Sequence, residues 1–174
     1  TATTNHGAMW VRDDSGSHLL SAVFEACTFS ENSAKQSAVA QCINADVRFD
    51  SCSFVKNTGT ANGSIMTLYE NCDILMDKCA FKENNVFNGA IYLYTNAKAT
   101  KPNLTITNSS FSGNVSTGDN GVIWARGDSG TITINCANST FSGNKAARRS
   151  AIFLYNVKNA NLISDSFFQT SSSA

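Results

Sequence analysis

The chain has 174 residues, a formal net charge of zero at pH 7 and only 15% charged residues. This balance argues against a nucleic-acid-binding protein, which usually carries a basic surface, and gives no support to binding at an anionic membrane. No apolar run approaches the roughly 18 residues of a membrane-spanning helix, so direct membrane insertion is not expected. A single proline and many Asn, Ser, Thr and Gly residues favour β structure with frequent turns.

From Phe29 onward, the chain repeats the pattern Phe-x-x-Asn. The phenylalanines are Phe29, Phe54, Phe81, Phe111 and Phe141, and the asparagines are Asn32, Asn57, Asn84, Asn114 and Asn144. Successive phenylalanines are 25, 27, 30 and 30 residues apart. A period of roughly 20 to 50 residues is typical of a solenoid or another repeat array. We therefore expect residues 1–174 to form one elongated module, interpreted as a piece of a longer chain with a possible linker at 169–174.

Each Phe-x-x-Asn pattern lies between two predicted strands. Before the phenylalanine, apolar and polar residues alternate, as a half-buried strand requires. After the asparagine and a variable loop comes a strand that begins with small and aliphatic residues: Gly7-Ala8-Met9, Ser37-Ala38-Val39, Gly63-Ser64-Ile65, Gly89-Ala90-Ile91, Gly121-Val122-Ile123 and Ser150-Ala151-Ile152. One repeat thus predicts three short strands that are too small to bury their own apolar faces. Stacking about six repeats in parallel buries these faces and makes an all-β parallel solenoid.

Stacked repeats bring equivalent residues into columns. The five phenylalanines are expected to stack face to face in the interior. The five asparagines are expected to form a ladder at one turn, where each amide bonds the neighbouring repeat and backbone groups that the turn leaves unpaired. Asn also tolerates the left-handed conformation of such turns better than most residues. If Asn114 faces inward, its Asn-x-Ser sequon should stay unmodified.

The strands after the loops predict an aromatic outer face. The column placed inside is Met9, Val39, Ile65, Ile91, Ile123 and Ile152. The residues placed outside are then Trp10, Ala40, Met66, Tyr92, Trp124 and Phe153, followed two positions on by Arg12, Cys42, Leu68, Tyr94, Arg126 and Tyr155. Because exposed apolar patches usually mark a contact surface, the candidate binding residues are Trp10, Tyr92, Tyr94, Trp124, Phe153 and Tyr155. Two alternatives stay open: the inward and outward sides are exchanged, or another part of the chain covers the aromatic residues.

The pairing of Phe-x-x-Asn with strands of the Gly-Ala-Ile type resembles the repeat of polymorphic outer-membrane proteins. The nearest match to that family's two motifs is Phe81-Lys82-Glu83-Asn84 with Gly89-Ala90-Ile91, followed by Phe111-Ser112-Gly113-Asn114 with Gly121-Val122-Ile123. The doubled glycine of the family motif is absent, and Ser37 and Ser150 replace the remaining glycine. The resemblance implies a right-handed parallel β-helix and a surface-exposed, adhesive role.

Six cysteines and several Asn-x-Ser/Thr sequons favour an extracellular or cell-surface location. Three of the cysteines share one predicted inward column, in which neighbouring repeats bring Cα atoms within disulfide range, so one pair could form. The possible pairs are Cys27–Cys52 or Cys52–Cys79 in that column, and Cys42–Cys72 elsewhere. The possible glycosylation sites are Asn62, Asn103, Asn108 and Asn138.

Parallel β-helices also include polysaccharide-active enzymes, which need acidic clusters for calcium or for acid–base chemistry. The best candidate is the column Glu25, Asp50 and Asp77, where stacked carboxylates would favour a cation. Polar residues are expected at this bend in any case, and the column does not continue with acidic residues. His6 and His18 lie near acidic residues, but their spacing matches no metal signature. We therefore expect no metal, no cofactor and no catalytic residues.

The sequence predicts a non-enzymatic extracellular β-solenoid that acts as a surface adhesion or structural assembly module. Its partner would be a carbohydrate or protein surface, or copies of itself, and not nucleic acid. The alternative is a polysaccharide lyase or hydrolase of the β-helix type, or a piece of one.

Overall fold

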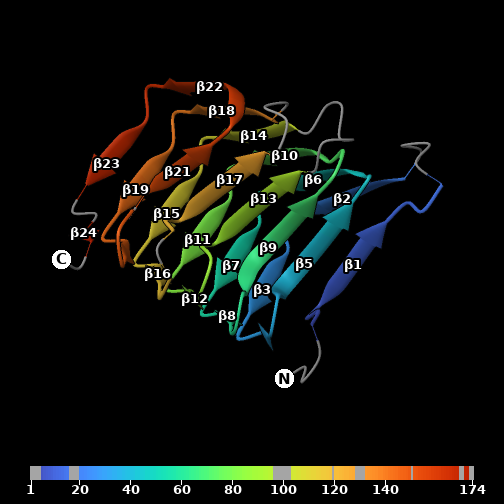
Figure 1. The fold of residues 1–174 in the computed structure, drawn as a ribbon, viewed down its shortest axis with the longest axis horizontal. Helices are drawn as coiled ribbons and strands as arrows, with labels where there is room; N and C mark the ends of the chain where they lie inside the picture. The colour runs from blue at the N-terminus through green and yellow to red at the C-terminus, as the bar shows by residue number, and fades with distance from the viewer. Residues whose placement is uncertain are drawn as a thin grey trace.

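The computed structural model describes residues 5–15, 20–95, 103–118, 120–127, 132–149 and 151–168, together with the backbone of 171–172. These residues form a right-handed parallel β-helix, as the sequence predicted. In Figure 1 the colour passes steadily from blue at one end to red at the other, so each rung, one full turn of the solenoid, lies beside its neighbours in sequence. Within these ranges there is no helix, and so none that could cross a membrane.

Two wide sheets carry most of the strand residues. Sheet A consists of β1 (Met9–Arg12), β5 (Ser37–Ile43), β9 (Ser64–Tyr69), β13 (Ile91–Thr95), β17 (Ile123–Gly127) and β21 (Ile152–Tyr155). Sheet B consists of β2 (Ser21–Glu25), β6 (Asp46–Asp50), β10 (Asp73–Asp77), β14 (Asn103–Thr107), β18 (Ile132–Ala137) and β22 (Val157–Ile163). Apolar side chains alternate inward along both sheets, as strands with one buried face require.

Two narrow sheets complete each rung. Sheet C consists of β3 (Thr28–Ser30), β7 (Ser53–Val55), β11 (Ala80–Lys82), β15 (Ser110–Ser112), β19 (Thr140–Ser142) and β23 (Ser166–Phe168). Sheet D consists of β4 (Ser33–Ala34), β8 (Thr58–Gly59), β12 (Asn85–Val86), β16 (Val115–Ser116), β20 (Lys145–Ala146) and β24 (Ser171–Ser172). A rung therefore has four strands where the sequence predicted three, because the two residues after each ladder asparagine also pair with the next rung. Residues 171–172 of the predicted linker 169–174 form β24 of this sheet. The other residues of the linker lie outside the described ranges.

A column of stacked phenylalanine rings from sheet C runs through the interior, and we call it the phenylalanine file. Parallel pairing sets Phe81 directly between Phe54 and Phe111, with ring centroids 4.4 and 4.7 Å away. Phe49 of sheet B meets Phe54 edge-on at 5.5 Å, which locks the file against the neighbouring sheet. The central rings are fully buried, so the file forms the axis of the hydrophobic core.

The asparagine ladder runs beside this file, and Asn84 shows its pattern. The Asn84 side-chain nitrogen donates hydrogen bonds to Phe54 O at 2.9 Å and to Asn114 Oδ1 at 2.8 Å. Asn84 Oδ1 accepts hydrogen bonds from the backbone nitrogen and the side-chain nitrogen of Asn57, at 2.9 and 3.0 Å. Each amide thus satisfies the backbone of one bend and connects two neighbouring rungs.

Residues with positive φ form the bends on either side of sheet C, and Asn44, Glu70 and Asn156 take the same conformation between sheets A and B. Single residues turn the chain from sheet B to sheet C: Ala26, Ser51, Lys78, Asn108, Asn138 and Ser164. The residues that turn it from sheet C to sheet D immediately precede the ladder asparagines: Glu31, Lys56, Glu83, Gly113 and Gly143. The ladder asparagines themselves do not take the left-handed conformation, although Asn tolerates it well. The preceding residue supplies the bend, and this leaves the asparagine side chain pointing inward.

The predicted outward columns of sheet A are wrong in two rungs, although Val39 and Ile65 are buried as predicted. Ala40 and Met66 pair in register with each other, and Met66 pairs with Ile91, so both are fully buried instead of facing outward. Cys42 and Leu68, also predicted to face outward, are likewise fully buried. The outer columns are Trp10, Gln41, Thr67, Tyr92, Trp124 and Phe153, and then Arg12, Ile43, Tyr69, Tyr94, Arg126 and Tyr155.

The cause of this error is an irregular start in two strands. The backbone nitrogens of Ile65 and Met66 both donate to Ala90 O, at 3.0 and 2.9 Å. The register between β5 and β9 also shifts between Ser37 and Ala40. An extra residue of this kind moves every later side chain to the opposite face of its strand.

Candidate ligand-binding site

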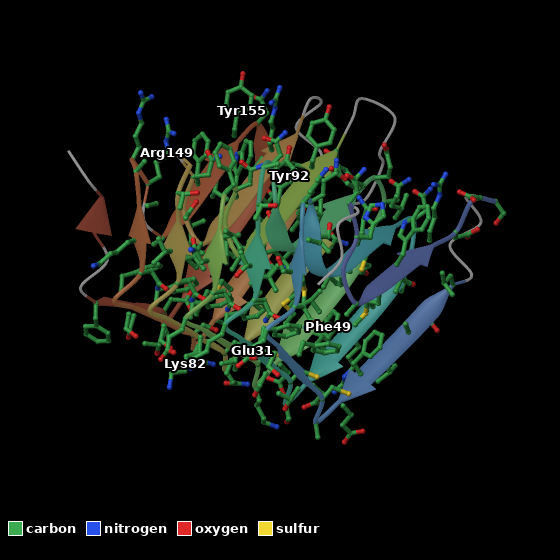
Figure 2. All side chains as sticks on the ribbon, turned by 90° about the horizontal axis from the view of Figure 1, so that it is seen from below. Glu31, Phe49, Lys82, Tyr92, Arg149 and Tyr155 are labelled. Atoms are coloured by element: carbon green, nitrogen blue, oxygen red, sulfur yellow. The ribbon has the colours of Figure 1, made fainter. Side chains whose placement is uncertain are left out.

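The outer face of sheet A carries a stack of aromatic rings. Tyr92 and Trp124 occupy equivalent positions in neighbouring rungs, with ring centroids 4.3 Å apart and planes 22° from parallel. Phe153 continues the stack at 6.3 Å from Trp124, and Tyr69 meets Tyr92 edge-on at 6.4 Å. Figure 2 shows Tyr92 and Tyr155 projecting from the side of the solenoid opposite Glu31 and Lys82. We call Tyr69, Tyr92, Trp124 and Phe153 the aromatic platform.

The six predicted binding residues do not form one continuous surface. Tyr92, Tyr94, Trp124, Phe153 and Tyr155 lie on adjacent strands of sheet A. Trp10 lies on β1, separated from Tyr92 in the same outer column by Gln41 and Thr67. Its ring stacks on His6 at 5.0 Å.

A groove opens beside the platform where the aromatic column gives way to Thr67. It has a volume of about 680 Å³. Its lining comprises polar residues Gln36, Asn62, Thr67, Asn88, Thr117 and Asn120, aromatic residues Tyr69, Phe87, Tyr92 and Trp124, and Gly118. None of these lining residues carries a formal charge at pH 7, and burial raises the pKa of Tyr69 further above its ordinary value. The groove thus combines carboxamide groups with aromatic rings.

The wall of this groove comes from the loops between sheets D and A. Asn88 Nδ2 donates a hydrogen bond to Asn62 O at 2.9 Å and thereby ties the loops of neighbouring rungs together. Gly118 packs against Phe87, where an added Cβ would lie only 2.5 Å from Phe87 O. The sequence patterns did not reveal Tyr69, Phe87 or the asparagines of this wall. Tyr69 was hidden by the register error. Asn62, Asn88 and Asn120 each directly precede the glycine that opens the next strand motif, and this constant spacing could have placed them in one column.

A second, smaller hollow of about 190 Å³ adjoins the platform. It is lined by Trp124, Arg126, Phe153 and Tyr155, and it shares Trp124 with the groove. The Arg149 guanidinium lies 4.0 Å from the centre of the Phe153 ring, a cation–π contact. This end of the platform is therefore positively charged, unlike the groove.

The acidic column Glu25, Asp50 and Asp77 lies in register on sheet B, away from the groove. Other side chains of the protein donate hydrogen bonds to the aspartates of this column. Arg48 contacts Asp50 at 2.8 Å, and the side chains of Thr107 and Asn108 each donate to Asp77 at 2.7 Å. These hydrogen bonds lower the pKa of both aspartates. The described ranges contain no group of three side chains placed to hold a metal ion, and His18 lies outside those ranges.

All six cysteines are free thiols in this structure, so the disulfide pairs remain predictions. Cys79 lies in a column that continues with Ser109 and Ser139. In this column the Ser109 hydroxyl accepts the backbone N–H of Cys79 at 3.0 Å, and Cys79 Sγ lies 3.4 Å from Asp77 O. The column thus acts as a second polar ladder, in which thiols and hydroxyls occupy equivalent places.

Alkylation with iodoacetamide at pH 8 is expected to modify Cys27 first. It is the one half-buried cysteine, whereas burial raises the pKa of Cys72 and Cys79 to about 11 and that of Cys136 to about 12, and only the thiolate reacts. Mass spectrometry should find a single fast adduct in the folded protein and full modification in urea. Two or more equally fast adducts would contradict this structure, and protection of Cys42 and Cys72 in urea would establish the predicted disulfide.

The sequons differ in their accessibility. Asn62, Asn108 and Asn138 are exposed and Asn103 is half-buried, so their glycosylation remains a prediction. Asn114 is 1% exposed and its Nδ2 donates to Phe81 O and Asn144 Oδ1. Expression in a eukaryotic secretory system should therefore leave Asn114 unmodified, as judged by peptide mass spectrometry after enzymatic deglycosylation. Any occupancy at Asn114 would show that the ladder forms after modification or not at all.

The fold and the repeated ladders define the chain as a β-solenoid repeat protein. Residues 108–126, which comprise the Phe111 motif, β16 and most of β17, match the family model described as the Chlamydia polymorphic membrane protein (Chlamydia_PMP) repeat. Together with the parallel β-solenoid, this match fits a repeat protein of the polymorphic membrane protein type, as the sequence predicted. No curated protein and no solved structure gives a significant match.

Proposed function

We propose that the chain is a non-enzymatic binding module on a cell surface and that it acts through the outer face of sheet A. The matched repeat is described as part of a membrane protein, which supports a surface location. The observation that carries the proposal is the groove of about 680 Å³ beside the aromatic platform. Mostly pre-formed pockets of this size, with aromatic walls and a few polar groups, are typical of ligand sites.

The lining of the groove favours binding over catalysis. Polysaccharide lyases and hydrolases need carboxylates or a basic residue at the reacting bond. The groove is lined by amides, hydroxyls and aromatic rings, while Asp50 and Asp77 lie on sheet B and are held by other side chains. The enzyme alternative therefore has no support from the described groove.

Adhesion of coated beads tests this proposal. Beads carrying the purified chain should attach to cultured mammalian cells, and Trp124→Ala should reduce attachment at least about tenfold. Lys82→Ala is the matched control, because Lys82 is exposed on the opposite side of the solenoid. The proposal is wrong if wild-type beads do not attach, or if both variants attach equally well.

End-to-end assembly is a second candidate function, favoured by the apolar surface of the last rung that the structure describes. Leu162, Ile163, Phe167 and Phe168 are 46%, 60%, 45% and 58% exposed there. Large exposed apolar residues at a sheet edge favour association. Analytical ultracentrifugation should show concentration-dependent oligomers that Ile163→Asp abolishes, and a monomer at all concentrations would exclude this function for the chain.

A further inference from the structure

We propose that the groove binds a neutral oligosaccharide, with sugar rings against Tyr92 and Trp124 and sugar hydroxyls on the surrounding side-chain amides. This inference rests on the proposed binding function and specifies its ligand. A sugar has apolar C–H faces and polar hydroxyl edges, so it needs a site with both kinds of surface side by side. The described lining offers both.

The aromatic part of the site is a column of outward-facing side chains in which a threonine follows two aromatic residues. Trp124 and Tyr92 lie one above the other in successive rungs, and the next outer position in that column is Thr67. Thr67, Tyr69 and Tyr92 all line the groove, which therefore adjoins the column where the aromatic rings end. A pyranose ring placed there would continue the stack and bury its C–H face against an aromatic surface.

The polar part of the site consists of carboxamides. Four of them, from Gln36, Asn62, Asn88 and Asn120, line the groove. A carboxamide offers two N–H donors and an oxygen acceptor, which matches a sugar hydroxyl that both donates and accepts. Asn88 and Asn120 are 7% and 8% exposed, so their side chains are held in place before a ligand arrives. Such preorganisation reduces the entropy lost on binding.

Charge and size select the ligand further. None of the described lining residues of the groove is charged, so a sulfated or carboxylated sugar would lose its hydration against them without gaining an ionic partner among them. The volume of about 680 Å³ lies in the range of small-ligand sites. A protein partner needs a broad contact of roughly 800 Å² on each side, and the groove by itself does not present such a surface. A short neutral glycan fits these limits better than an acidic glycan or a protein.

Direct titration tests this inference. The probes are a desialylated biantennary N-glycan, the same glycan with its sialic acids, and a heparin-derived hexasaccharide, each titrated into the purified chain by calorimetry. The desialylated glycan should bind and the heparin hexasaccharide should not. Trp124→Ala and Tyr92→Ala should each weaken binding by at least about 30-fold, as truncation of a central aromatic contact does. Asn120→Ala should weaken it by about tenfold, the value of one or two lost hydrogen bonds.

Two further variants distinguish the loss of the binding site from a loss of folding. Val23→Ala truncates an exposed apolar side chain on sheet B, outside the groove, and it should leave binding unchanged. Thr117→Trp adds bulk at an exposed position of the groove wall, and it should block the glycan while circular dichroism stays that of the wild type.

The outcomes separate the two proposals. Binding of acidic glycans alone, or neutral binding that survives Trp124→Ala and Thr117→Trp, would overturn the glycan inference. Groove-dependent cell attachment with no binding of any of the three glycans would overturn it too, and would leave the proposed function standing with a protein as its partner. If the wild-type beads do not attach to cells, while the desialylated glycan binds in the groove, the proposed function fails and the glycan site stands.

Discussion

Replacing Asn84 with leucine is expected to lower the free energy of unfolding by about 4 kcal/mol. Leucine fills a similar volume but makes none of the hydrogen bonds of the amide. The backbone nitrogen and side-chain nitrogen of Asn57 then lose their acceptor, and Phe54 O loses a donor, all in a buried bend. Each buried polar group left without a partner costs about 1–3 kcal/mol.

The matched control is Asn32→Leu at the first rung of the ladder. Asn32 Nδ2 donates a hydrogen bond to Asn57 Oδ1. That oxygen also accepts a hydrogen bond from the backbone nitrogen of Asn32, so it keeps a partner when the Asn32 amide is removed. We expect a loss of about 1 kcal/mol. Urea unfolding followed by circular dichroism gives both values. Equal losses for the two variants would mean that the ladder amides act independently and that burial adds nothing to their contribution.

The sequence predicted the ladders well because parallel stacking in register repeats one environment in every rung. A residue such as Phe81 meets the same side chain above and below, so the chemical identity of Phe54, Phe81 and Phe111 encodes their contact directly. The spacing of the repeats changes from 25 to 30 residues without disturbing this column, because the loops between sheets absorb the difference.

The sequence could not fix the register of β5 and β9. Val39 and Ala40, and likewise Ile65 and Met66, are adjacent apolar residues, so either member of each pair satisfies an inward position. In β9 the backbone shifts the register through the shared acceptor Ala90 O, and in β5 the register shifts between Ser37 and Ala40; neither feature leaves a mark in the residue pattern. The fourth sheet escaped prediction for a related reason, since strands of two residues are too short to show alternation.

The groove was only partly predictable, because its two halves arise differently. Tyr92 and Trp124 lie in a repeated column and could be found by alignment of the rungs. The same alignment could have found Asn88 and Asn120, which directly precede the glycines of the next strand motifs, whereas Phe87 lies in one of the loops of unequal length and has no equivalent in the other rungs. The same arrangement explains how such a solenoid acquires a specific site. The ladders fix a rigid face, and unequal loops break its symmetry at one rung, so that the groove can differ from the repeat that carries it.

Truncation of Phe81 to alanine is expected to cost about 3–5 kcal/mol, the range for removing a buried phenylalanine from a core. Phe81 is fully buried and lies between two rings at 4.4 and 4.7 Å, so neither neighbour can close the cavity without leaving its own stack.

Phe167→Ala is the control for this variant within the same file. Phe167 ends the file, stacks on Phe141 at 4.9 Å and is 45% exposed, so its loss should cost less than about 1.5 kcal/mol. Hydrogen exchange adds a spatial readout, because a solenoid couples each rung mainly to its neighbours. In Phe81→Ala the amides of β7, β11 and β15 should exchange faster than those of β19, whereas a uniform increase along the whole chain would show that the solenoid unfolds as one cooperative unit.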